Sequence, residues 1–66
     1  MDTERIRAAI QAHRRLKRIY RQPERAPEWL NIQADLVDAE AFLKEFRNLT
    51  PDQELDYRRV RIALRR

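Results

Sequence analysis

The sequence contains no glycine, cysteine or serine, and it has a single histidine among its 66 residues. Without cysteine, the chain has neither a disulfide framework nor a thiolate metal site. The loops that cradle phosphates in nucleotide-binding sites need glycine, because their backbone adopts positive φ close to the ligand. Nucleophilic catalysis by Ser or Cys has no residue to use here. These absences predict a protein that is not an enzyme and holds no cofactor.

Long hydrophobic runs are also missing. No apolar stretch approaches the roughly 18 residues that span a bilayer, and the charged stretch "MDTERIRAAI" lacks the apolar region of a signal peptide. We therefore expect a cytoplasmic protein that does not bind membranes, with residues 1–66 forming one helical domain. A domain of this size buries only about 60% of the surface of its unfolded chain. Because disulfides and metals cannot compensate, self-association or binding to a partner is the remaining route, and we expect a homo-oligomer, specifically a dimer.

The lack of glycine disfavours hairpins, and the positions of proline divide the chain into helices. Pro23 and Pro27 form one interruption and Pro51 another. The expected fold is all-α, a small three-helix bundle with helices at about 3–22, 27–48 and 51–65.

The segment 3–22 is amphipathic at the helical period. Asp2, Thr3 and Glu4 suit the beginning of a helix. Its apolar side comprises Ile6, Ala9, Ile10, His13, Leu16 and Tyr20, and Arg7, Arg14, Arg18 and Arg21 lie nearly opposite.

The segment 27–48 is the most apolar. Pro27 is expected at its first helical position, and Asn48 is expected to end the helix in a left-handed backbone conformation. A three-four spacing predicts one buried side: Trp29, Ile32, Leu36, Ala39, Leu43 and Phe46. Further apolar residues flank this side, which predicts a central helix that is apolar on two sides. The candidates for an interface are Val37, Phe42 and Leu49.

The segment 51–65 has the clearest start, with Thr50 as N-cap, Pro51 next and Gln53 placed for a capping box. The stretch "RVRIALR" also alternates like a β-strand. The capping signal and the absence of other strands favour a helix.

Few residues suggest chemistry of their own. His13 on an apolar side is interpreted as a packed histidine rather than a metal ligand. Asp35, Asp38 and Glu45 share one side of a helix, and we interpret them as a solvated or salt-bridged face rather than a metal or acid–base cluster. No catalytic, cofactor-binding or metal-binding residue is predicted.

Positive charge is the strongest functional signal, with 15 Lys and Arg against 11 Asp and Glu, a net charge of +4. In a bundle with short loops the first and third helices run parallel, so their C-terminal halves should form one basic pole. This pole contains Arg7, Arg14, Arg15, Lys17, Arg18, Arg21, Arg58, Arg61 and Arg65, and the same reasoning adds Arg66.

Two functions agree with this layout. The first is a small non-catalytic regulatory or adaptor protein that binds a protein partner through the basic pole and the surplus apolar surface of segment 27–48. The alternative is a nucleic-acid-binding protein that contacts phosphates through its Arg-rich first and third helices.

Overall fold

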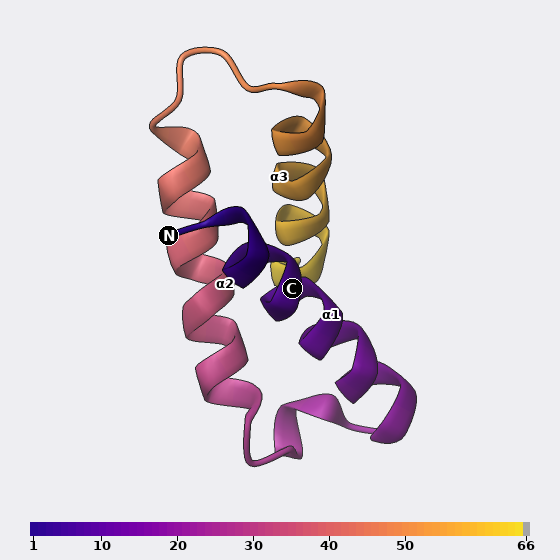
Figure 1. Cartoon of the computed structure of the whole chain (residues 1–66). Coiled ribbons are helices and arrows are strands. Elements are labelled where there is room, and N and C mark those ends of the chain that lie inside the picture. The colour runs from indigo at the N-terminus through magenta and orange to yellow at the C-terminus, as the bar shows by residue number, and fades with distance from the viewer. Residues whose placement is uncertain (66) are drawn as a thin grey trace.

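A computed structural model describes residues 1–65, and Arg66 lies outside the described residues. The helices are α1 (Thr3–Ile19), α2 (Trp29–Lys44) and α3 (Pro51–Leu64), and the 3-10 turn η1 (Pro23–Arg25) lies between α1 and α2. In Figure 1, α1 and α3 run in the same general direction and α2 runs the opposite way. The predicted all-α three-helix bundle is confirmed. The strand alternative for "RVRIALR" is wrong, because these residues belong to α3.

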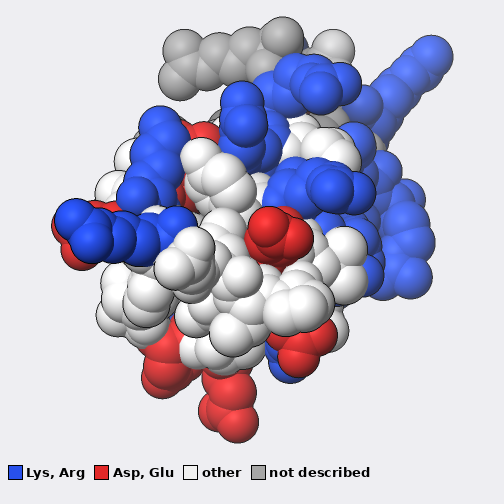
Figure 2. All heavy atoms as spheres, turned by 90° about the horizontal axis from the view of Figure 1, so that it is seen from above, with Lys and Arg blue, Asp and Glu red and all other residues white. Residues whose placement is uncertain are grey.

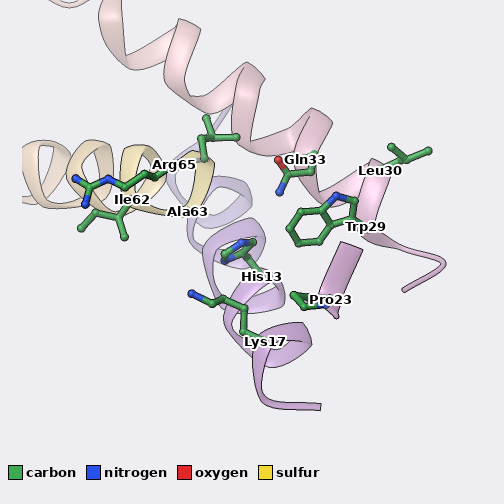
Figure 3. Close-up of a pocket in the computed structure, with 10 residues that line it drawn as sticks. His13, Lys17, Pro23, Trp29, Leu30, Gln33, Ile62, Ala63 and Arg65 are labelled. Atoms are coloured by element: carbon green, nitrogen blue, oxygen red, sulfur yellow. The ribbon is translucent and has the colours of Figure 1, made fainter. Parts of the chain in front are cut away.

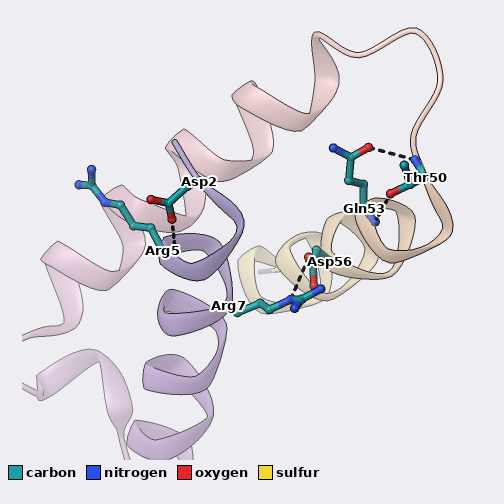
Figure 4. A network of polar contacts seen from close by, with 6 residues as sticks. All are labelled: Asp2, Arg5, Arg7, Thr50, Gln53 and Asp56. Carbon is teal, nitrogen blue, oxygen red and sulfur yellow. Dashed lines mark hydrogen bonds and ion pairs between the residues drawn. The ribbon is translucent and has the colours of Figure 1, made fainter.

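Two helices begin as the sequence predicted. The Asp2 carboxylate accepts the Arg5 backbone N–H at 2.7 Å and caps α1. At α3 the capping box is complete (Figure 4): the Gln53 N–H donates to the Thr50 hydroxyl at 3.2 Å, and the Thr50 N–H donates to the Gln53 side chain at 3.0 Å. These bonds satisfy amide groups that have no partner within the helix.

The predicted start of the second helix is wrong, because Pro27 lies in a turn and α2 begins at Trp29. The reason is the η1 turn, in which the Ala26 N–H donates to the Pro23 carbonyl at 3.0 Å. This turn buries Ala26 in the core and leaves Pro27 exposed.

The first two helices are shorter than predicted. α1 ends at Ile19 rather than residue 22, and Tyr20 adopts extended backbone angles. Proline restricts the residue before it, so the helix cannot continue smoothly to Pro23. α2 ends at Lys44 rather than residue 48, and the N–H groups of Glu45 and Phe46 donate three residues back.

These early ends correct three residue assignments. Tyr20 and Phe46 were expected in the core and are exposed, because the chain leaves the helix path before each can turn inward. Asn48 does not end α2 in a left-handed conformation, because no residue in the range 1–65 has positive φ. α3 ends at Leu64, within one residue of the prediction.

The core lies along α2, which packs against both other helices, as expected for the central helix. Leu36 and Ala39 of α2 are fully buried, as is Val60 of α3. At the far end of α2, Phe42 is half-buried and its ring meets the Phe46 ring edge-on, with centroids 5.2 Å apart. The core comprises Ile6, Ala9, Ile10, Leu16, Ala26, Ile32, Leu36, Ala39, Leu43 and Val60.

Ion pairs join the helices at the edges of this core. Arg5 of α1 reaches Asp35 of α2 at 3.4 Å, and both side chains are partly solvated. Arg7 of α1 reaches Asp56 of α3, also at 3.4 Å. Within residues 1–65, the helices lack the length and apolar character needed to cross a membrane.

Candidate binding groove

A hollow of about 500 Å³ lies where the second half of α1, the η1 turn, the start of α2 and the end of α3 meet (Figure 3). A second hollow of about 140 Å³ shares His13, Lys17, Ile62 and Ala63 with the first. A third of about 70 Å³ shares Ile10, Arg14 and Arg59 with the second. Because neighbouring hollows share lining residues, we describe the three together as one surface between α1 and α3 and call it the α1–α3 groove.

The parallel packing of α1 and α3 positions the walls of this groove. The ion pair between Arg7 of α1 and Asp56 of α3 marks where the contact between these two helices begins. From there α1 presents Ile10, Arg14 and Lys17 at the three-four spacing of one helix face, and α3 presents Arg59, Ile62 and Ala63 at a similar spacing. α3 therefore ends beside the middle of α1, and the last turn of α1 projects beyond it (Figure 1).

The floor of the groove is apolar and aromatic. His13 is buried against the half-buried Trp29, with ring centroids 5.6 Å apart and planes tilted by 37°. Burial lowers the pKa of the His13 imidazole, and the positive charge of Lys17 one turn later lowers it further. His13 is therefore a neutral packing residue at physiological pH. Ile62 is exposed at the edge of the same floor.

One polar group in the groove lacks a partner. The Gln33 side chain points into the hollow toward His13 and Trp29 (Figure 3). Its amide nitrogen is buried and has no hydrogen-bond partner among the described residues. A buried donor without an acceptor costs roughly 1–3 kcal/mol.

The rim of the groove is positively charged. Its cations are Arg7, Arg14, Lys17, Arg59 and Arg65, and no Asp or Glu appears among the described residues that line it. Arg7 is partly neutralised by Asp56, whereas the other cations have no ion pair within residues 1–65. In Figure 2, which views the molecule from above, Lys and Arg occupy much of the upper and right parts of this face, whereas Asp and Glu gather at the lower edge and also lie among the cations.

The structure brings only part of the predicted basic pole together. Arg7, Arg14, Lys17 and Arg65 line the groove. Arg18 lines a shallow hollow on α1 that shares Gln11 and Arg14 with the groove, so Arg18 adjoins the groove without lining it. The remaining members lie outside the groove and are exposed: Arg15, Arg21, Arg58 and Arg61. The guanidinium carbon of Arg61 lies over the Tyr57 ring, 5.7 Å from the ring centroid.

Sequence reasoning missed Arg59, which is half-buried between the two helices. The signal that identifies it is its distance of three residues from both Asp56 and Ile62, which places it on the side of α3 that faces α1. The three residues predicted for an apolar interface differ in their exposure. Phe42 and Leu49 are half-buried against the core, and only Val37 among the three is well exposed.

The other charged groups have simple surroundings. Asp35 pairs with Arg5, and Asp38 and Glu45 are exposed to solvent. Within residues 1–65, no three His, Asp or Glu side chains are grouped so as to hold a metal ion. The sequence matches no protein-family model, and no curated protein or solved structure is significantly similar to it.

Proposed function

We propose that this protein is a small non-catalytic adaptor or regulatory protein that binds an acidic segment of a protein partner in the α1–α3 groove. The observation that carries the proposal is the combination of a cationic rim with an apolar floor in this groove. Carboxylates of the partner pair with Arg14, Lys17 and Arg59. An apolar side chain between those carboxylates packs on the exposed Ile62.

The floor favours a peptide over a nucleic acid. Base stacking needs an aromatic ring with a free face, whereas the Trp29 ring already packs against His13. The exposed Ile62 offers an apolar contact that phosphates and sugars do not use. Duplex DNA therefore serves as the competing ligand in the test.

Fluorescence anisotropy with three labelled probes tests the proposal. The first is a short peptide of Glu and Leu, the second has each Leu replaced by Ser, and the third is a short DNA duplex. We expect the Glu–Leu peptide to bind at least about tenfold more tightly than the Ser peptide, since burying one leucine side chain contributes about 1.5–3 kcal/mol. Equal binding of the two peptides would show an unspecific basic surface. Preferred DNA binding, weakening steeply with salt, would establish the nucleic-acid alternative.

A matched pair of charge reversals locates the site. Arg14→Glu with Lys17→Glu places two acids on the groove, and Arg15→Glu with Arg21→Glu makes the same change in net charge on exposed positions outside it. We expect only the first pair to abolish binding of the Glu–Leu peptide. Equal losses in both pairs would mean that net charge, rather than the groove, attracts the peptide.

A further inference from the structure

α2 carries a second apolar surface on the side away from the core. It consists of Leu30, Ala34, Val37 and Ala41, spaced by four, three and four residues, and we call it the outer stripe of α2. Leu30 and Val37 are 78% and 53% exposed. The core residues Ile32, Leu36, Ala39 and Leu43 occupy the opposite side of the helix. The outer stripe is therefore an apolar helix face without a partner within residues 1–65.

The stripe alternates large and small residues in a self-complementary order. If a second α2 lies antiparallel with a two-fold axis between positions 34 and 37, Leu30 faces Ala41 of the second copy. In the same register Val37 faces Ala34 of the second copy, and each pairing occurs twice. Every contact then joins a large side chain to a small one, which lets two helices approach closely without voids. A shallow, open hollow of about 560 Å³ borders the stripe at Ala34 and Val37 and is lined also by Asp38, Glu40 and Leu64.

The polar residues beside the stripe match the same register. Asn31 and Asp38 flank one side of it, and Gln33 and Glu40 flank the other. In an antiparallel pair, like flanks meet across the two-fold axis, so Asn31 comes near Asp38 of the second copy. This contact pairs an amide donor with a carboxylate acceptor and occurs twice. No acid faces an acid.

A parallel pair is less favourable on both counts. Identical residues would face one another, so layers of two alanines would alternate with layers of two larger side chains and pack unevenly. The flanking positions of a parallel pair also bring Glu40 near Glu45 of the second copy, which repel. We therefore infer that the outer stripe of α2 binds a second copy of this chain in an antiparallel, two-fold symmetric dimer. This dimer uses the outer side of α2, which shares only Leu30 with the lining of the groove, and it is argued from the packing of α2, so it does not depend on the proposed function.

Sedimentation equilibrium over a range of protein concentrations tests the dimer. We expect the average mass to rise from 8.1 kDa to about twice this value. Ala34→Val alone overpacks the contact and Val37→Ala alone leaves a cavity, so each should weaken dimerisation at least about tenfold. The double substitution exchanges the two residues and should restore association, because position 34 faces position 37 of the second copy. Leu55→Ala, at an exposed position on α3, is the control that leaves association unchanged.

The single substitution Ala34→Val separates a specific dimer from a merely adhesive surface. It adds apolar area, so unspecific association would strengthen, whereas the specific contact weakens. A chain that stays monomeric at all concentrations, or an Ala34→Val variant that associates as tightly as the parent, would overturn the inference. Circular dichroism of each variant verifies that these exposed substitutions leave the helices intact.

Disulfide trapping tests the antiparallel register, and the chain is suited to it because it has no cysteine of its own. Leu30→Cys and Ala41→Cys variants are oxidised separately and as a mixture. The inferred register gives a cross-link between the two variants in the mixture and none within either alone, since positions 30 and 41 meet only each other. Cross-links within each variant alone would indicate a parallel pair, and no cross-link in the mixture would exclude the register. Either result contradicts the inference.

Discussion

The Nε of Arg7 lies 3.4 Å from a carboxylate oxygen of Asp56, and this contact joins the first turns of α1 to the first half of α3 (Figure 4). The two side chains are very differently solvated. The Asp56 side chain is 4% exposed, whereas the Arg7 side chain is 48% exposed. The carboxylate therefore depends on its partner for stabilisation, and the guanidinium remains largely in water.

This asymmetry predicts unequal effects of removing either partner. Arg7→Met leaves a buried carboxylate without its hydrogen bond and should lower the free energy of unfolding by about 1–3 kcal/mol. Asp56→Asn keeps the shape of the side chain and releases Arg7 to solvent, so it should cost less than about 1 kcal/mol. Urea unfolding of both variants measures the difference. Equal losses would show that Arg7 contributes through packing rather than through Asp56.

Burial of His13 predicts a pH-dependent stability. Its pKa is lowered by burial and by Lys17, whereas in the unfolded chain it is about 6.5. Between these two pKa values the unfolded state binds more protons than the folded state, so the free energy of unfolding falls as the pH is lowered from about 7. Urea unfolding at a series of pH values above the range of the carboxylates measures this slope.

The matched variant for this prediction is His13→Phe, which keeps a ring against Trp29 and removes the titrating group. Its stability should be nearly independent of pH over the same window. A slope that persists in His13→Phe would assign the pH dependence to another group.

Arg59 offers a direct test of the groove, because its neighbour Arg58 is exposed and lies outside it. Arg59→Met keeps an apolar stem and loses the charge, and we expect binding of the Glu–Leu peptide to weaken about tenfold with little change in stability. Arg58→Met makes the same chemical change outside the groove and should leave binding nearly unaltered. Anisotropy titrations of the two variants under one salt condition make the comparison. A similar loss in both would contradict a specific role for Arg59.

The capping box at α3 predicts a clear effect on stability. Thr50→Ala removes the acceptor of the Gln53 N–H and should cost about 1 kcal/mol. Thr50→Ser retains the hydroxyl and should restore most of the loss. Thr3→Ala, at the first residue of α1 where Asp2 is the cap, is the control and should change little. Thermal unfolding measures all three variants, and an unchanged stability in Thr50→Ala would mean that α3 is held by packing alone.

The sequence by itself determined the class of fold and the signals for where two helices begin. Thr50, Pro51 and Gln53 specify a helix start through bonds that span only a few residues. The three-four spacing of Ile32, Leu36, Ala39 and Leu43 likewise specifies the buried side of α2. Such signals are local, so they are readable before the chain folds. The sequence predicted the ends of the helices less well than their beginnings. Tyr20 and Phe46 continue the apolar pattern, yet they lie past the last residues of α1 and α2.

Only the tertiary structure decided which cations lie together. The sequence places Arg14, Arg15 and Lys17 in one run, but the groove contains Arg14 and Lys17 and excludes Arg15. It also adds Arg59, which is 42 residues beyond Lys17 in the chain. The deciding factors are the parallel alignment of α1 with α3 and the point at which α3 ends against α1. Both depend on packing between residues far apart in sequence, such as Arg7 with Asp56, which no local pattern encodes.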